Sequence, residues 1–407
     1  MNTPLEGKRI ILGVTGSIAA YKAVDLASKL SQAGAEVDVI LTRSAIEFVK
    51  PITFQSVTGR RTYTEADLWG KEGHVLHIGL GKAADLLIIA PATANTLAKL
   101  AHGLADNLLT VTALAIDCPL MLAPAMDGGM YSHAATQANL KILEQRGAIV
   151  VGPAEGHLAS GQKGIGRMVE PEAIMGHARK QLSRGGLLEN YNVLITAGGT
   201  QEPIDPVRVI TNRSSGKQGY ALAQAAQDLG ADVTLVSAPV NLKPPVGAEL
   251  VEVRTARQML DTILAQLSNV DVLVMAAAVT DFTPEVTAAA KIKKEQGIPV
   301  IHLKQTADIL SEVAIYRRKE GRPKIVVGFA AETSELLENA RKKLDSKQLD
   351  LIAANDISTS EAGFEVDTNL ITLIDRAGHI ETLPLMSKAE AARAIMKRVV
   401  QLLTIDV

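Results

Sequence analysis

The sequence is poor in cysteine and in aromatic residues, and both shortages exclude classes of function. The single cysteine, Cys118, excludes an internal disulfide and a cysteine cage around a metal. Aromatic residues make up 3% of the chain and the net charge is -2, so base-stacking platforms and a basic nucleic-acid surface are not expected. No apolar run reaches the roughly 18 residues of a membrane span. Because the polar start is also unlike a signal peptide, we expect a soluble cytoplasmic protein.

The hydrophobic residues follow the alternation that is typical of parallel α/β sheets. The chain has 407 residues, which predicts two or three domains. "KRIILGVTG" is typical of a buried strand, "SIAAYKAVDLASKLSQAG" of an amphipathic helix, and "AEVDVILTRSA" of the next strand. The pattern continues through "ADLLIIAPATANT", "CPLMLAPAM" and "GAIVVGPAEG". A parallel sheet with helices on both faces follows from this pattern.

A change in composition near residues 182–190 predicts a domain boundary. After "LSRGGLLENYN", the run "VLITAGGT" begins a second series of strands, which includes "DVLVMAAAV", "KIVVGFAAE", "DLIAAND" and "LITLID". We predict two tandem doubly wound, Rossmann-like α/β domains, residues 1–186 and 190–407. The strands end in small residues followed by Thr, Asn or Asp, at the edge where such sheets bind ligands. Close sheet–helix packing explains the small residues, but the polar ones favour two ligand sites.

The first site centres on "GVTGSIAAYK", a predicted strand-to-helix turn. Free N–H groups at a helix start, with the Ser17 hydroxyl, suit a phosphate, although an unliganded tight turn explains the same glycines. "APATANTLAKLAHGLADNLLT" adds several hydrogen-bonding side chains directly after a strand. Together these stretches favour a phosphorylated planar ligand with many polar edges.

These stretches, with "LHIGLGKAADLLIIAPATANT", "GLADNLL" and "PAMDGGMY", resemble the flavin-containing cysteine decarboxylases. With the second half, nearly the whole chain resembles the family in which phosphopantothenoylcysteine decarboxylase is fused to phosphopantothenate–cysteine ligase, in coenzyme A biosynthesis. The resemblance implies that His77 is the active-site histidine, although a histidine in such a segment is commonly structural. It also implies bound FMN, contacted by Gly16, Ser17, Thr42, Ser44, Thr93, Asn95, Asp106 and Asn107.

Two residues depart from the decarboxylase pattern. The family's flap over the substrate carries a cysteine that protonates the intermediate, and "LASGQKGIGRM" has Ser160 instead. The family's clamp "PxMN" is "PAMD" here, with Asp127, and an ionised carboxylate only accepts hydrogen bonds. Either the decarboxylase remains active with another proton donor (water, His157, His77 or a protonated Asp127), or this half binds flavin and reduces the intermediate poorly. We favour activity, because the flavin and flap motifs are retained.

The second site centres on "TNRSSGKQG", where two serines, two glycines and a lysine precede a predicted helix. This composition suits an anion, although a simple helix cap explains Ser215. "AAKIKKEQG" places Lys291, Lys293 and Lys294 in one segment, which is either a solvated surface or part of a triphosphate site. We assign phosphopantothenate binding to Ser214, Ser215, Gly216 and Lys217.

The second half resembles the ligase family through "ITAGGTQEPIDPVRVITNRSSGKQG", "AAAVTDF", "KIKK", "VGFAAET" and "DLIAANDI". The resemblance implies activation of a carboxylate by CTP with Mg²⁺, an acyl-cytidylate, and attack by the cysteine amine. Lys291 would stabilise the transferred charge, and Asn212 would act on the acyl intermediate. The implied CTP-binding residues are Met275, Ala276, Ala277, Asp281, Lys291, Ala307, Asp308, Ile309, Leu310, Phe329, Lys343 and Lys347.

Three other functions fit parts of the sequence. A flavin-binding regulatory subunit would explain Asp127 and Ser160 but not the attached ligase half. A flavin prenyltransferase lacks the "PAM" clamp and the flap, and a dinucleotide oxidoreductase does not explain "SSGKQG" or "KIKK". The resemblance also implies a homo-oligomer, a dodecamer with trimeric flavin domains and dimeric ligase domains. No acidic cluster in the sequence locates the Mg²⁺ ligands.

Overall fold

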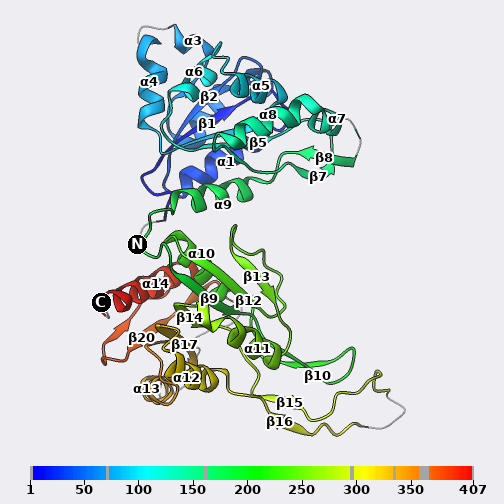
Figure 1. The fold of residues 1–407 in the computed structure, drawn as a ribbon, viewed down its shortest axis with the longest axis vertical. Coiled ribbons are helices and arrows are strands. Elements are labelled where there is room, and N and C mark those ends of the chain that lie inside the picture. Colours follow the sequence, from blue (N-terminus) through cyan, green and yellow to red (C-terminus); the bar gives the residue numbers. More distant parts are fainter. Residues whose placement is uncertain are drawn as a thin grey trace. The chain divides into compact units, whose positions relative to one another are not determined.

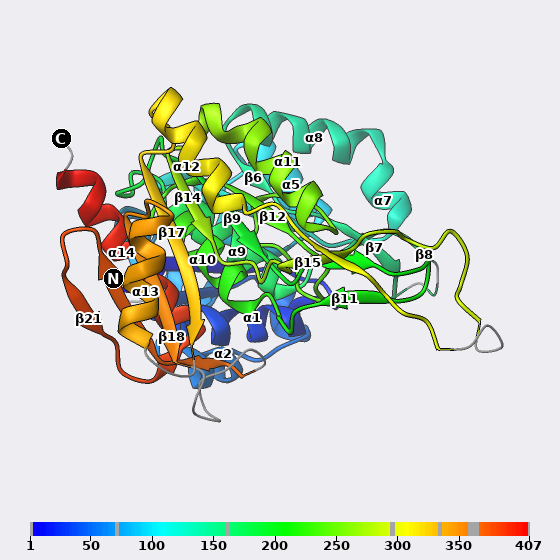
Figure 2. The same cartoon turned by 90° about the horizontal axis from the view of Figure 1, so that it is seen from below.

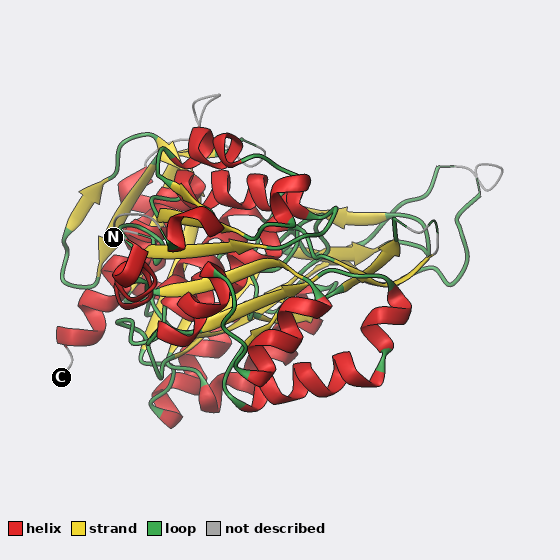
Figure 3. Cartoon of the chain, turned by 90° about the horizontal axis from the view of Figure 1, so that it is seen from above, coloured by secondary structure: helices red, strands yellow, loops and turns green. Residues whose placement is uncertain are grey.

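The protein folds into two compact units that meet in sequence between Leu182 and Ser183. The computed structural model describes residues 3–69, 73–159, 161, 163–293, 298–332, 336–356 and 366–405. Within each unit, strands form a central layer between helices (Figure 1), and Figure 3 distinguishes the helices in red from the strands in yellow. The fold is therefore the predicted pair of α/β domains, and each is described by itself.

The first unit contains a six-stranded parallel sheet with strand order β3-β2-β1-β4-β5-β6. The order reverses between the adjacent strands β1 and β4, and this reversal is the usual ligand position in doubly wound sheets. The strands are β1 (Arg9–Val14), β2 (Glu36–Leu41), β3 (Thr62–Tyr63), β4 (Leu86–Ala92), β5 (Leu120–Pro124) and β6 (Ile149–Val150).

Helices cover both faces of this sheet because its strand residues alternate between two apolar cores. Ile10 and Leu12 of β1 pack into one core with the first helix group, whereas Ile11 packs into the other core. The first group comprises α1 (Ala20–Gln32), α2 (Pro51–Thr58) and α9 (Pro171–Leu182). The second comprises α4 (Gly73–Ala83), α5 (Ala94–His102), α6 (Leu108–Ala115) and α8 (Ala134–Gln145). The short elements are η1 (Ala45–Glu47), α3 (Glu65–Leu68) and α7 (Gly128–Ser132).

Residues 154–157 and 163–167, before and within the glycine-rich stretch, pair as an antiparallel hairpin, which the sequence pattern did not predict. Its strands are β7 (Ala154–His157) and β8 (Lys163–Arg167), and β8 packs against α7 (Figure 2). Gly166 has φ 141°, and a Cβ there would lie 2.3 Å from the Met126 carbonyl oxygen. Only glycine therefore allows the hairpin to lie this close to the segment before α7.

The second unit contains an eight-stranded sheet with strand order β13-β12-β9-β14-β17-β18-β20-β21. Its first six strands are parallel, whereas β20 runs antiparallel to both of its neighbours, β18 and β21, so the sheet is mixed at one edge. The order reverses between β9 and β14. The strands are β9 (Asn192–Ala197), β12 (Asp232–Ser237), β13 (Glu249–Glu252), β14 (Val272–Met275), β17 (Ile325–Glu332), β18 (Leu351–Asp356), β20 (Ile371–Asp375) and β21 (Ile380–Thr382).

Two helix groups again cover the sheet, and they form two cores. One group is α10 (Lys217–Asp228) with α14 (Lys388–Ile405), and the other is α11 (Ala256–Gln266), α12 (Ile309–Glu320) and α13 (Leu336–Ser346). Small two-stranded sheets lie outside the main sheet and pair β10 (Gln201–Pro203) with β11 (Val209–Thr211), β15 (Phe282–Pro284) with β16 (Leu303–Gln305), and β19 (Thr368–Asn369) with β22 (Met386–Ser387). A short helix, η2 (Leu267–Asn269), follows α11. None of the described helices is long and apolar enough to cross a membrane.

Candidate functional site

The turn after β1 lies at the strand reversal of the first unit. A Cβ at Gly16 would lie 2.5 Å from the Ser44 Cβ, so a larger residue would displace the segment that follows β2. The Ser17 hydroxyl accepts from the Ala19 N–H at 3.3 Å, directly before α1. The Thr42 hydroxyl lies 3.5 Å from that of Ser44. The ends of β1 and β2 therefore bring four of the predicted flavin residues together.

The segment after β4 joins this turn through Thr93. Its N–H donates to the Thr15 hydroxyl at 3.1 Å, and its side chain caps α5 by accepting from the Thr96 N–H at 3.4 Å. Asn95 lies exposed in the first turn of α5. The start of α5 is therefore held at the switch point, where its N–H groups favour an anion or a polar ligand edge.

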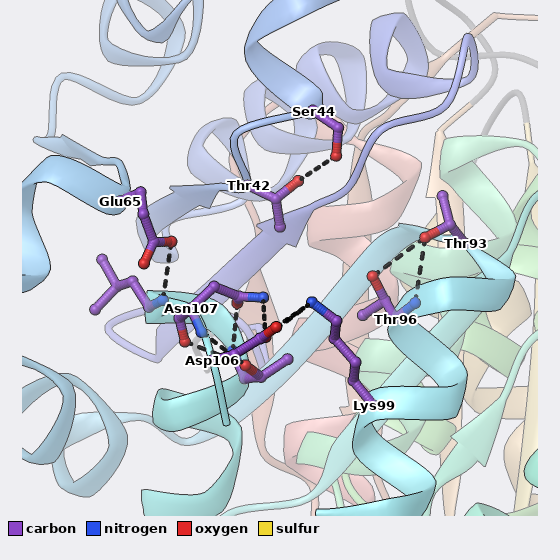
Figure 4. A network of polar contacts seen from close by, with 10 residues as sticks. Thr42, Ser44, Glu65, Thr93, Thr96, Lys99, Asp106 and Asn107 are labelled. Carbon is purple, nitrogen blue, oxygen red and sulfur yellow. Dashed lines mark hydrogen bonds and ion pairs between the residues drawn. The ribbon is translucent and has the colours of Figure 1, made fainter. Parts of the chain in front are cut away.

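Asp106 and Asn107 form a third polar group before α6 (Figure 4). Lys99 Nζ donates to both Asp106 carboxylate oxygens, at 2.8 and 2.7 Å, and this contact lowers the pKa of Asp106. The Asn107 side chain caps α6 by accepting from the Thr110 N–H at 3.0 Å. Lys99 was not among the predicted site residues. The only signal of its ion pair with Asp106 in the sequence is that it lies seven residues earlier.

His77 lies on α4, which packs against α6. Its ring is half-buried, and its Nδ1 atom is buried without a hydrogen-bond partner among the described residues. A buried polar atom without a partner costs free energy, and a bound group commonly satisfies it. The histidine therefore fits a position that faces a ligand.

Asp127 is the N-cap residue of α7, and its carboxylate accepts from the Gly129 N–H at 3.0 Å. The neighbouring Met126 N–H donates to the Gly166 carbonyl at 3.0 Å, which ties this clamp segment to the hairpin. The Asp127 carboxylate therefore caps a helix, a structural contact that the sequence did not reveal. Ser160 lies outside the described residues.

The second unit contains a cavity of about 950 Å³ beyond the reversal between β9 and β14. It is lined by the end of β14 and the residues directly after it, the turn before α10, the start of α12, and lysines from α13 and the segment after it. The predicted residues that line it are Asn212, Ser214, Ser215, Gly216, Lys217, Met275, Ala276, Ala277, Asp281, Ala307, Asp308, Ile309, Leu310, Phe329, Lys343 and Lys347. Residues from distant parts of the second unit's sequence are thus brought to one cavity.

The turn before α10 requires its glycine. Gly216 is the N-cap residue of α10, with φ 73°, and its N–H donates to the Ser214 hydroxyl at 3.4 Å. The preceding Asn212 donates from Nδ2 to the Val279 carbonyl at 2.9 Å. This contact holds the turn against the segment that follows β14.

Two lysines from α13 and the segment after it reach the other side of the cavity. Lys343 Nζ donates to the Phe329 carbonyl at 2.7 Å. Lys347 donates to the Asp308 carboxylate and to the Ser311 hydroxyl, the latter at 3.1 Å. Burial acts to raise the pKa of Asp308, but the hydrogen bonds from Lys347 and the Ser311 N–H outweigh it and lower that pKa.

Lys291 is predicted to belong to this site, but it does not line the cavity. It is exposed, and the next residue, Ile292, donates from its N–H to the buried Asp205 at 3.2 Å. Lys294 lies outside the described residues. Several other lining residues were not predicted, and among them Asn355, Asn369 and Lys388 belong to elements far along the chain.

Comparison with known proteins accounts for both units. Residues 1–183 match the Flavoprotein family, and residues 188–403 match the family described as DNA/pantothenate metabolism flavoprotein C-terminal domain. The coenzyme A biosynthesis bifunctional protein CoaBC of Bacillus subtilis (strain 168) is 45% identical over 401 residues, which cover 98% of each chain. CoaBC of Mycobacterium tuberculosis (strain ATCC 25618 / H37Rv) is 44% identical over 408 residues, and the match covers 97% of each chain.

The chain belongs to the CoaBC family. It is a flavoprotein and a bifunctional enzyme of coenzyme A biosynthesis, with decarboxylase and ligase activities. Among solved structures, the crystal structure of the C-terminal domain of a CoaBC is 39% identical, covers 54% of this chain and 98% of that one, and has a TM-score of 0.46. A mutant PPC decarboxylase complexed with pantothenoylaminoethenethiol is 37% identical, covers 43% of this chain and 97% of that one, and has a TM-score of 0.39.

Membership of the CoaBC family confirms the resemblance found in the sequence motifs, and gives no support to an impaired or regulatory first half. Among the described residues, no group of three or more His, Cys, Asp or Glu side chains could hold a metal ion.

Proposed function

We propose that residues 190–407 ligate cysteine to 4'-phosphopantothenate with CTP, through an acyl-cytidylate. The observation that carries this proposal is the cavity, which is lined by residues at the end of β14 and directly after it, by the turn before α10, and by Lys343 and Lys347. Main-chain groups of a strand end suit the edge of a cytosine ring, whereas cations and a helix start suit phosphates.

Each part of the cavity then has a role. Met275, Ala276 and Ala277 would contact the cytosine. The rest of CTP would be held by the segment 307–310, Asp281, Phe329, Lys343 and Lys347. The turn 214–217 would bind the phosphate of phosphopantothenate. The substrate carboxylate displaces pyrophosphate from CTP, and the cysteine amine then forms the C–N bond while the bond to CMP breaks and the amine loses a proton to solvent.

Asn212 and Lys291 would act on the acyl-cytidylate. Because Lys291 lies outside the cavity lining, its segment would have to approach the bound nucleotide. Mg²⁺ would bind to oxygens of the triphosphate. The described residues contain no acidic cluster that could hold the ion by itself.

We propose that residues 1–186 decarboxylate phosphopantothenoylcysteine with FMN. The close approach at Gly16, the start of α5 and the unpartnered Nδ1 of His77 support this flavin site. When bound, FMN supplies a reversible two-electron oxidation of the carbon that carries the thiol, which gives the carbanion left by CO2 a C=S group to delocalise into. His77 would move a proton, and Asp127 and Ser160 would lie against the substrate.

We further propose a homo-oligomer, a dodecamer with trimeric flavin domains and dimeric ligase domains, in the cytoplasm. Large apolar side chains on the first unit support association, because Trp69 is 86% exposed and Tyr21 and Leu114 are each 61% exposed. Mass photometry of the full chain would give the assembly directly.

The ligase proposal is tested by pyrophosphate release from CTP and 4'-phosphopantothenate without cysteine, with ATP as the control nucleotide. Release with CTP and little with ATP is expected, and release with ATP alone would contradict the assignment of the nucleotide. The flavin proposal is tested by denaturing the purified protein and identifying the released chromophore by mass spectrometry. FMN is expected, and a dinucleotide would contradict the site.

A further inference from the structure

Two separate turns of the first unit meet at the proposed flavin site. We call residues 15–19, between β1 and α1, the first turn, and residues 93–95, where α5 begins after β4, the second turn. β1 and β4 are parallel neighbours in the sheet, so their carboxyl ends lie at the same edge. A ligand that contacts both turns needs them at a fixed separation, and the contacts that set this separation therefore matter for binding.

The backbone ladder of the sheet does not extend as far as these turns. The pairing between β1 and β4 ends at Gly13 and Ile89. Pro91 lies two residues further along β4, and a proline has no N–H to donate to a neighbouring strand. Another contact therefore has to hold the first turn against the second.

The side chain of Thr15 makes that contact. Its hydroxyl donates to the Pro91 carbonyl at 2.6 Å and accepts from the Thr93 N–H at 3.1 Å. Thr15 is 1% exposed, so water does not compete for these bonds. The Thr15 main-chain carbonyl also accepts from the Ser17 N–H at 2.9 Å, within the first turn. One buried residue thus contacts both turns.

The contact at Thr93 extends into α5. The Thr93 hydroxyl caps this helix by accepting from the Thr96 N–H at 3.4 Å (Figure 4). Because Thr93 is the N-cap residue, its position determines where the free N–H groups of the first helical turn lie. Thr15 therefore sets the position of these N–H groups relative to the first turn.

We propose that Thr15 is a positioning residue for FMN, because its hydroxyl holds the two turns at the separation that the cofactor requires. This inference rests on the proposed flavin site. The hydroxyl has one proton and donates it to Pro91, so it has none to offer the cofactor. Without the hydroxyl the two turns lose their shared contact, and FMN would have to bring them together as it binds. The cost of that ordering would appear as weaker binding.

The test compares FMN binding by the full-length wild-type holoprotein with binding by Thr15→Val, which has nearly the same shape and no hydroxyl. Each purified protein is diluted in steps, and the fluorescence of the released FMN gives the Kd. We expect the Kd to rise about tenfold in Thr15→Val, a change of the size that one or two lost hydrogen bonds produce.

Thr112→Val is the matched control. Thr112 is also fully buried in the first unit, but its hydroxyl donates to the Leu108 carbonyl at 2.7 Å within α6. Both variants lose one buried hydroxyl, so both should unfold at a lower temperature than wild type. Only Thr15→Val should bind FMN more weakly, which separates positioning from a general loss of stability.

A second pair of variants isolates the hydroxyl, in case Thr15→Val does not fold. Thr15→Ser and Thr15→Ala both lack the methyl group, and they differ from each other only in the hydroxyl. We expect Thr15→Ser to keep the wild-type Kd within about twofold, and Thr15→Ala to weaken binding as Thr15→Val does. Equal Kd values for Thr15→Ser and Thr15→Ala would overturn the proposal.

Other outcomes also decide the matter. A wild-type Kd in Thr15→Val would overturn the proposal, and so would equal rises in Thr15→Val and Thr112→Val. A wild-type chain that binds no FMN would refute the proposed flavin site, and the role of Thr15 with it.

Discussion

Replacing Gly219 by alanine tests whether the position of α10 depends on contact with the sheet. Gly219 lies in the first turn of α10, and a Cβ there would be 2.6 Å from the Ala197 Cβ and 2.8 Å from the Thr196 carbonyl oxygen. Overpacking costs about 1–3 kcal/mol, and the better helix propensity of alanine returns about 1 kcal/mol. Because two of the nearest atoms belong to the backbone of β9, no side-chain rotation relieves the contact. The overpacking cost therefore lies in the upper part of that range, about 2–3 kcal/mol, and the net loss after the gain in helix propensity is about 1–2 kcal/mol.

The assay is differential scanning calorimetry of the full chain. For a unit of this size, each kcal/mol shifts Tm by about 2–4 °C, so the second unit should melt about 2–8 °C lower. Because α10 begins at the turn that we propose binds phosphopantothenate, the KM for phosphopantothenate should rise as well. Gly79→Ala is the control, since Gly79 lies in α4 and its Cβ would have no neighbour within 4 Å. That variant should gain about 0.5–1 kcal/mol. A Gly219→Ala protein as stable as wild type would refute the packing argument.

Three further predictions follow from single contacts. Burial raises the pKa of the Cys118 thiol, so iodoacetamide at about pH 8 should alkylate it several-fold more slowly than free cysteine, and equal rates by mass spectrometry would contradict this. The pKa of Asp308 is lower in the folded state than its ordinary value of about 3.9. Its ion pair with Lys347 therefore stabilises the fold at pH values above about 3.9, and this stabilisation is lost as the pH falls through the folded-state pKa. The urea midpoint of Asp308→Asn should therefore depend less on acid pH than that of wild type, and an unchanged pH profile would count against the pair. The buried Lys22 donates to the Met168 carbonyl and to Glu170, each at 3.0 Å, so Lys22→Met should cost about 1–3 kcal/mol, whereas an unshifted thermal transition would show that these bonds contribute nothing.

Much of the fold could be predicted from the sequence because buried parallel strands have a simple signature. Continuous apolar runs such as residues 86–92 end in small residues and alternate with amphipathic helices. That alternation predicted two doubly wound domains, which the structure confirms. The polar residues after the strands predicted two ligand sites, and in the second unit such residues line the cavity. The antiparallel pairing of β20 with β18 was not predicted, because the composition of an apolar strand does not indicate whether it runs parallel or antiparallel to its neighbour.

The parts of the sites that depend on distant contacts could not be predicted. Asn369 and Lys388 belong to a short strand and a helix start near the end of the chain, and only folding brings them to the cavity. The capping contact of Asp127 likewise depends on where α7 begins. The replacement of Asn by Asp in the "PxMN" motif does not show where that helix starts. No local sequence pattern therefore predicts the position of Asn369 and Lys388 or the capping contact of Asp127.

The central claim is that one chain performs ligation and then decarboxylation. The most direct measurement supplies 4'-phosphopantothenate, CTP, Mg²⁺ and cysteine labelled with ¹³C at its carboxyl carbon to the purified flavoprotein. Mass spectrometry follows the products. The account predicts unlabelled 4'-phosphopantetheine together with labelled CO2. Arrest at labelled phosphopantothenoylcysteine would contradict the proposed activity of residues 1–186, and failure to form any amide would contradict that of residues 190–407.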